Sequence, residues 1–160
     1  MKDRMHAYPS KIRYPSDKQL EIWKLRRDKL KGREIADKKD ITEAAVSKSL
    51  KEANKRIKDL IEYSARMNKI ELERTSAKLG FAWGKSHTFK LKAWITFSPV
   101  NGVHVWYKHE GACEACGELG YCRSVLKQEF KERNLKLPSE MMKPSKLAEL
   151  LFQILEAMVE

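Results

Sequence analysis

Residues 32–58 read GREIADKKDITEAAVSKSLKEANKRIK, and the architecture expected for the chain follows from this stretch. Ile35 and Ala36 form the apolar side of a short helix, and Ile41 fills the turn after it. Thr42 then offers a hydroxyl where a helix N-cap is needed. Beyond it, apolar residues recur at alternating spacings of four and three, which places one apolar stripe along a second helix. The stripe consists of Val46, Leu50, Ala53, Ile57 and Leu60.

The opposite side of the second predicted helix carries small and cationic residues. Small residues near its start allow the helix end to approach a surface closely, and polar and positively charged groups follow. A major groove admits a helix presented in this way. The residues on this side are Glu43, Ala44, Ser47, Lys48, Lys51 and Lys55.

Over residues 16–60 the chain resembles the helix-turn-helix of region four of bacterial sigma factors and of LuxR-type regulators, and it is most similar to archaeal Tfx-type DNA-binding proteins. The residues that carry the likeness are Gln19, Ile22, Leu25, Arg33-Glu34-Ile35-Ala36, Ile41-Thr42, Val46, Leu50 and Ala53. The turn departs from the family pattern, because Lys38-Lys39-Asp40 lacks the usual glycine. Asp40 is therefore expected to adopt the left-handed backbone conformation that glycine tolerates best.

The resemblance implies that the second helix reads double-stranded DNA. Thr42 would start this helix, and Glu43, Ala44, Ser47 and Lys48 would face base edges. Phosphate contacts are expected from the cations around them, namely Arg33, Lys39, Lys51 and Lys55.

The net charge of +11 is distributed unevenly along the 160 residues. Residues 1–69 contain 20 Lys and Arg against 11 Asp and Glu, whereas residues 70–160 contain 13 against 11. The excess of +9 in the first part favours a polyanionic partner for the predicted helix-turn-helix. The alternative is a generally lysine-rich surface of the kind found in thermophilic proteins.

Composition points to a cytoplasmic protein with no membrane partner. No segment approaches the ~20 apolar residues that span a bilayer. The N-terminus, MKDRMHAYPSKIRYP, has charge but no apolar centre, so it does not read as a secretory signal. Three cysteines leave one over after any disulfide pairing, which favours a reduced compartment and metal or redox chemistry.

The fold class predicted is α+β with two parts after a basic arm. Residues 1–15 form the arm, and Ser16 with Gln19 marks the start of a first helix that runs to about Lys29. Residues 16–73 form the helix-turn-helix part, whose second helix continues to Met67. The stripe beyond Ile57 has the spacing of a seam with a second copy, which makes a homodimer an expectation, and the alternative is that the stripe packs on the first two helices and the C-terminal part of this chain.

Residues 74–160 are predicted to form a regulatory or dimerisation domain. Residues 74–87 read as a connecting stretch with two glycines, and residues 89–97 and 103–109 as a hairpin around Asn101-Gly102. Phe97 would pair with Val103, which sets Trp94 opposite Trp106 on an outer face. Helices follow at residues 122–134 and from Pro144, and the broad apolar face of the last one must cover this sheet or a second subunit.

His109, Cys113, Cys116 and Cys122 follow the hairpin with the spacing His-x3-Cys-x2-Cys-x5-Cys. Structural zinc takes four such ligands in a tetrahedron, and three cysteines with one histidine are a normal set. An iron–sulfur cluster is the alternative cofactor, and a bare thiol switch is a third interpretation. The non-functional interpretation is that the cysteines bind no metal and lie in a small buried patch.

The function predicted is a sequence-specific DNA-binding transcriptional regulator with a C-terminal metal domain, either structural or sensory. The alternatives are a protein–protein adaptor of the transcription machinery and an iron–sulfur redox-sensing regulator. An enzyme is not expected, because a complete four-ligand site leaves no position for water and no nucleophile–base arrangement stands out.

Overall fold

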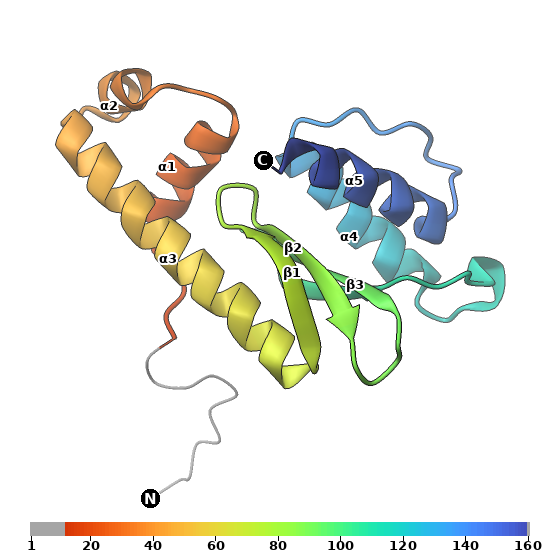
Figure 1. Ribbon diagram of the computed structural model, residues 1–160. Coiled ribbons are helices and arrows are strands. Elements are labelled where there is room, and N and C mark those ends of the chain that lie inside the picture. The colour runs from red at the N-terminus through yellow and green to blue at the C-terminus, as the bar shows by residue number, and fades with distance from the viewer. Residues whose placement is uncertain (1–11, 160) are drawn as a thin grey trace, which may run out of the picture.

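The computed structural model describes residues 12–159 and has three layers (Figure 1). A four-stranded antiparallel sheet with the order β1-β2-β3-β4 forms the middle layer. The helices α1 and α3 pack on one face of this sheet, with α2 packed against them beyond the sheet, and the last two helices lie on the other face. The α+β class is therefore confirmed, whereas most of the predicted basic arm, residues 1–11, lies outside the described residues.

The N-terminal part consists of α1 (Asp17–Arg27), α2 (Gly32–Lys39) and α3 (Glu43–Met67). The predicted capping box is present, since Ser16 and Gln19 exchange hydrogen bonds of 3.2 and 3.0 Å. A small apolar cluster holds the three helices together through Ile22, Ile35, Ala36 and Val46. The helices end close to their predicted positions.

The strands β1 (Ile70–Ser76) and β2 (Phe81–Ser86) occupy the stretch that the sequence predicted to be a connection. That prediction is wrong because β1 is a polar edge strand, whose pairing is irregular between Leu72 and Arg74. Gly84 lies opposite this irregularity, where a Cβ would fall 1.9 Å from the carbonyl oxygen of Glu71. The glycine thus permits close backbone approach within a strand. The boundary placed at residues 73/74 falls inside β1.

The strands β3 (Lys92–Ser98) and β4 (Gly102–Tyr107) form the predicted hairpin. Phe97 pairs with Val103, and Trp94 pairs with Trp106, as the alternation of apolar residues indicated. The first strand begins three residues later than expected. Phe89 is instead exposed before it, and its ring packs edge-on against Tyr107 at 4.9 Å.

The apolar stripe of α3 beyond Ile57 packs against the protein's own sheet. Ile57, Leu60 and Ile61 are at most 1% exposed. They belong to the same cluster as Trp23 of α1 and the inward residues of β3, namely Ala93, Ile95 and Phe97. The expected dimer seam along this helix is therefore wrong, because the sheet already covers the stripe.

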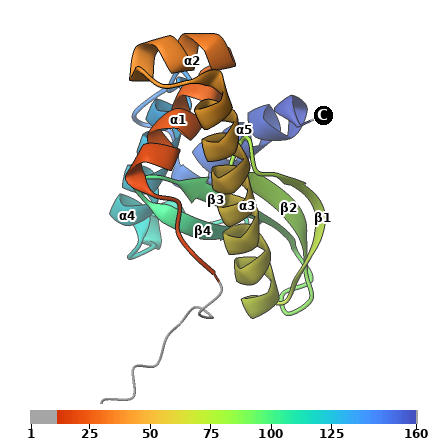
Figure 2. The same ribbon diagram turned by 90° about the vertical axis from the view of Figure 1, so that its left-hand side faces the viewer.

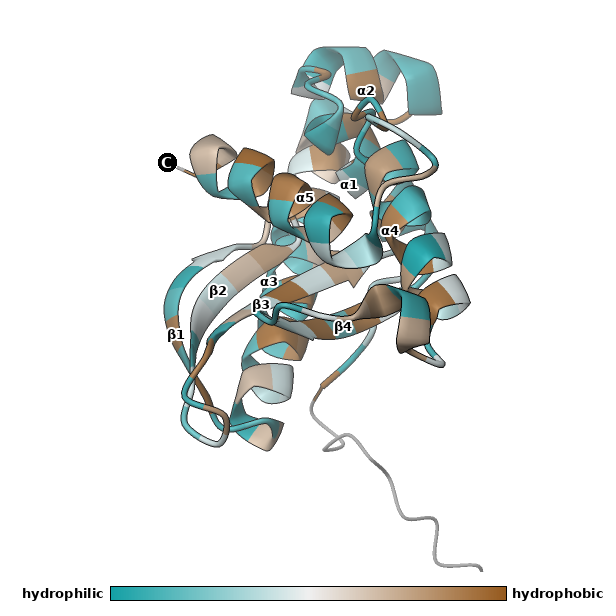
Figure 3. Cartoon of the chain, turned by 90° about the vertical axis from the view of Figure 1, so that its right-hand side faces the viewer, coloured by the Kyte–Doolittle hydropathy of each residue, from teal (hydrophilic) through white to brown (hydrophobic). Residues whose placement is uncertain are grey.

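The other face of the sheet is covered by α4 (Leu119–Glu132) and α5 (Pro144–Met158), which cross the strands in Figure 3. Phe152 of α5 stacks on Trp94 at 4.6 Å. Glu156 accepts a hydrogen bond of 2.7 Å from Trp94 Nε1 and pairs with Lys92 Nζ at 2.6 Å. The outer face of tryptophan and lysine is thus an internal interface, and the apolar face of α5 also covers this chain's own sheet.

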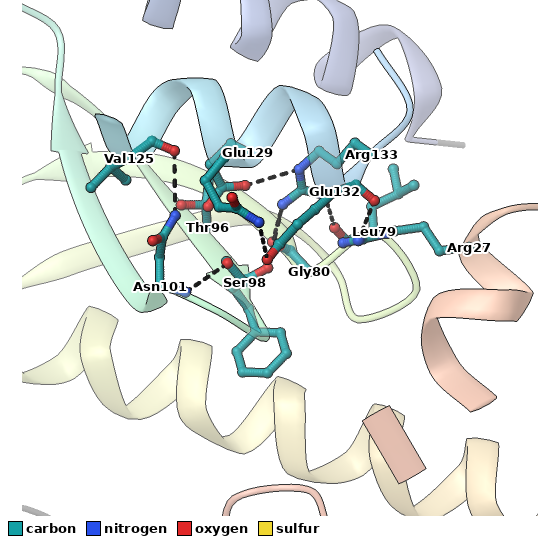
Figure 4. A network of polar contacts seen from close by, with 12 residues as sticks. Arg27, Leu79, Gly80, Thr96, Ser98, Asn101, Val125, Glu129, Glu132 and Arg133 are labelled. Carbon is teal, nitrogen blue, oxygen red and sulfur yellow. Dashed lines mark hydrogen bonds and ion pairs between the residues drawn. The ribbon is translucent and has the colours of Figure 1, made fainter. Parts of the chain in front are cut away.

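A buried polar network joins the helix-turn-helix to α4 (Figure 4). The Arg133 guanidinium pairs with Glu129 at 3.0 Å, with both side chains at most 3% exposed. It also donates to the carbonyl oxygens of Leu79, Gly80 and Phe97. Arg27 of α1 donates to the Glu132 carbonyl oxygen at 2.7 Å, and burial, with the nearby Arg133 charge, lowers the pKa of Arg27 to about 10. These contacts fix α1 against the sheet layer.

Candidate nucleic-acid interface and cysteine segment

The turn between α2 and α3 sets the start of the candidate reading helix. Asp40 adopts φ 53° and ψ 51°, so it does take the left-handed conformation predicted for it. Thr42 then has an extended backbone, and its Oγ1 accepts a hydrogen bond of 3.1 Å from the Ala45 amide. The predicted N-cap is confirmed. Glu43, which follows it, places a carboxylate where the helix dipole is positive.

The four side chains predicted to face base edges are all exposed. Glu43, Ala44, Ser47 and Lys48 lie on one side of α3, whereas Val46 on the other side is 1% exposed and packs into the three-helix cluster. Figure 2 shows α2 and the first turns of α3 extending beyond the sheet. The sheet packs on the second half of α3 and leaves the first half accessible.

The cations predicted to hold phosphates fall into two groups. Arg33 and Lys51 are exposed, and within residues 12–159 neither forms an ion pair. Lys39 is half-buried and pairs with Glu21, and its hydrogen bond and charge lower the pKa of that carboxyl group. Lys55 pairs with Asp59 at 3.1 Å. These two cations are therefore partly neutralised within the protein.

Lys38 was not among the predicted phosphate-binding cations, but it is exposed like Arg33 and Lys51. Lys38 lies at the end of α2, next to the turn, and is exposed. No ion pair involves it in the described part of the chain. Lys38 and Lys39 are adjacent, and adjacent residues of a helix point in different directions. Because Lys39 reaches Glu21 of α1, Lys38 is the one whose side chain stays exposed.

The four predicted metal ligands lie in the segment after β4 and at the start of α4. A short 3-10 turn spans Cys113–Ala115, and Cys122 is in the first turns of α4. Cys113 is buried, Cys122 is half-buried, and His109 and Cys116 are exposed. Between residues 108 and 124, Cys113 is the single buried residue. Burial of apolar groups therefore does little to hold this segment in place.

Two of these side chains converge at Gly111. A Cβ on that glycine would lie 3.2 Å from His109 Nδ1 and 3.7 Å from Cys113 Sγ. The Cys113 thiol is also 3.4 Å from Ser145 Oγ of α5, and hydrogen bonding by Ser145 lowers the pKa of Cys113. Burial raises the pKa of the Cys122 thiol, and the charges of Cys116, Glu118 and Cys113 raise it further.

These side chains do not surround one common point. Over residues 12–159, no three or more His, Cys, Asp or Glu side chains are placed so that they can hold a metal ion. His104, the other histidine of the hairpin, points elsewhere, since its Nε2 is 2.9 Å from the Tyr121 hydroxyl and its ring stacks on Trp106. The structure therefore brings the predicted ligands into one segment but does not arrange them as a formed site.

Comparisons with protein-family models, with curated proteins and with solved structures found no match. None of the described helices is long and apolar enough to cross a bilayer. The candidate interface therefore has to be interpreted from its own geometry and charge.

Proposed function

We propose that this chain is a sequence-specific DNA-binding transcriptional regulator that inserts the first half of α3 into the major groove of double-stranded DNA. The observation that carries the proposal is the exposed face of Glu43, Ala44, Ser47 and Lys48 at the free end of α3. A helix ~10–12 Å across fits a major groove ~12 Å wide, provided that nothing else in the protein covers it.

The residue types on this face suit base readout. Ala44 and Ser47 are small, so they allow the helix axis to approach the base edges. Lys48 donates to guanine O6 and N7, and Glu43 accepts from the cytosine amino group, while a serine contacts either kind of base. Lys48 is therefore the side chain expected to contribute most to sequence preference.

Phosphate binding would come mainly from the cations that have no carboxylate partner. Arg33 and Lys38 on α2 and Lys51 on α3 are exposed, and they lie on the two helices that form the proposed interface. Lys39 and Lys55 are expected to contribute less, because Glu21 and Asp59 already pair with them. Each phosphate contact releases condensed counterions and so steepens the dependence of binding on salt.

The test starts from the full chain and a pool of random duplexes, from which preferred sequences are selected. Affinities are then measured by fluorescence anisotropy over a range of salt concentrations. Lys48→Ala should lose about 1–3 kcal/mol of preference for the selected duplex. Lys51→Ala should weaken binding to all duplexes and reduce the salt slope by about 1. Lys55→Ala should reduce affinity in the same even way but by less.

Lys146→Ala is the matched control, because it removes an exposed lysine from α5 on the other side of the sheet. It should leave both affinity and salt slope unchanged. If Lys48→Ala and Lys51→Ala bind every duplex as the unmodified protein does, the assignment of this face is wrong. A protein that binds no duplex at low salt would instead favour the adaptor function.

The proposal includes a homodimer because the DNA sites of such regulators are commonly two-fold symmetric. Both apolar helix faces considered for it pack on the protein's own sheet. Light scattering of the protein with and without the selected duplex counts the copies. One copy per duplex would exclude the dimer and leave the reading face intact.

A further inference from the structure

Few buried side chains hold the segment between β4 and α4 in place. Cys113 is its single buried residue over positions 108–124, and the ion pair between Lys143 and Glu114, at 2.8 Å, lies on the surface. Exposed ion pairs contribute little to stability. We propose that His109, Cys113, Cys116 and Cys122 bind one zinc ion, which fixes this segment to the start of α4.

The backbone places the three cysteines on successive turns of one compact path. The Cys116 amide donates to the Cys113 carbonyl oxygen at 3.1 Å, and the Leu119 amide to the Cys116 carbonyl oxygen at 3.3 Å. The Cys122 amide then donates to the Glu118 carbonyl oxygen at 2.9 Å as α4 begins. Turns of this kind keep the backbone of the three cysteines folded back on itself, so that side-chain rotation is what remains for the sulfur atoms to meet at one ion.

The His109 ring lies near Cys113, across Gly111. That ring and the Cys113 sulfur both lie within 3.7 Å of the position that a Gly111 Cβ would occupy. A side chain at residue 111 would crowd the His109 ring, which lies 3.1 Å from that position, whereas glycine leaves the space open. His109 is therefore the fourth ligand that the geometry selects, and His104 is not, because it is held by Tyr121 and Trp106.

Gathering the four ligands around an ion requires little rearrangement of the core. His109 and Cys116 are exposed, so their side chains can rotate without loss of packing. Cys113 is buried and would keep its position, because its sulfur is hydrogen-bonded to Ser145 Oγ of α5 at 3.4 Å. Such outer partners orient a ligand and raise metal affinity. The ion would thereby tie together β4, α4 and α5 in one place.

Zinc is the cofactor class that fits these ligands best. Three thiolates and an imidazole complete a tetrahedron and leave no open position, which is typical of a structural site. The binding energy of such an ion contributes directly to folding where the core is thin. An iron–sulfur cluster uses similar ligands, so the experiment has to distinguish the two.

The decisive experiment measures metal, sulfide and absorbance on the full chain purified without oxygen, and no DNA is involved. About one zinc per chain and a colourless sample are expected, and cobalt substitution should give the intense bands of a tetrahedral thiolate site. A brown sample containing iron and sulfide would overturn the zinc assignment. A metal-free protein whose thermal unfolding is unaffected by zinc or chelator would overturn the site.

Variants at the exposed ligands keep the experiment interpretable, because neither position contributes to the core. Cys116→Ser and His109→Ala should lose at least tenfold in zinc affinity and lose the cobalt charge-transfer band. Ser145→Ala should weaken binding by about tenfold, in the range known for outer partners. His104→Ala, a histidine on the preceding strand, is the control and should bind zinc normally. Equal affinity in all four variants would refute the proposed ligand set.

Discussion

The two halves of α3 carry the same apolar periodicity but meet different surroundings. The first turns pack Val46 and Leu50 into a small cluster with α1 and α2, and the opposite side of these turns is exposed. The second half buries Ile57, Leu60, Ile61 and Ala65 against the sheet. One helix thus serves as a surface element at one end and as a core element at the other.

The difference shows that an apolar stripe specifies which side of a helix is covered and leaves open what covers it. The spacing beyond Ile57 is compatible with a second copy of the chain, but the protein's own sheet supplies the partner. A rigid attachment of the second half also has a consequence for function. It holds the first half at a fixed position relative to the sheet, so the proposed reading face is positioned by the core.

The largest effect is expected from truncating the core half of the helix. Leu60 is 1% exposed, so Leu60→Ala should lower the free energy of unfolding by about 2–5 kcal/mol through lost burial and a cavity. Leu50, half-buried in the small cluster, is the matched control, and Leu50→Ala should cost less. Urea denaturation followed by circular dichroism measures both. Equal losses would contradict the contrast between the two halves.

A smaller effect is expected where the exposed half begins. Thr42→Ala removes the acceptor for the Ala45 amide and should lower the free energy of unfolding by about 1 kcal/mol. Thr42→Ser retains a hydroxyl and should restore most of this loss. Thermal denaturation of the three proteins provides the comparison. An alanine variant as stable as the serine variant would mean that the cap does not hold the start of α3.

Local patterns were sufficient to predict the helix-turn-helix and the hairpin. The capping box at Ser16, the hydroxyl of Thr42 and the alternation around Trp94 all act within a few residues, so a single sequence displays them. Each of these features depends on the period of a helix or strand and not on the rest of the fold.

Features that depend on distant partners were not predictable in the same way. The strand β1 has the sequence IELERTS, whose polar residues suit an edge strand but do not alternate clearly. The pairing of Lys39 with Glu21 joins residues 18 positions apart, and the network at Arg133 joins α4 to a turn 53 or 54 positions earlier. For the cysteine segment, the spacing suggested candidate ligands but could not show how their side chains are placed, and the described residues do not form a completed metal site.

The turn before α3 gives the smallest expected effect, and its sign is the opposite of the others. Asp40 is held at φ 53°, where a side chain is disfavoured and glycine is not. Asp40→Gly should therefore raise the free energy of unfolding by about 0.5–1 kcal/mol, because relief of this strain exceeds the added flexibility of the unfolded chain.

Asp37→Gly is the matched control for this variant, since it introduces the same residue at an exposed position inside α2. There, glycine should lower the free energy of unfolding by about 0.5–1 kcal/mol. Precise thermal denaturation of both variants measures two changes of opposite sign. If Asp40→Gly is also destabilising, the aspartate side chain contributes more to the stability of the turn than its left-handed backbone conformation costs, and aspartate at this position would be a stabilising feature of the chain.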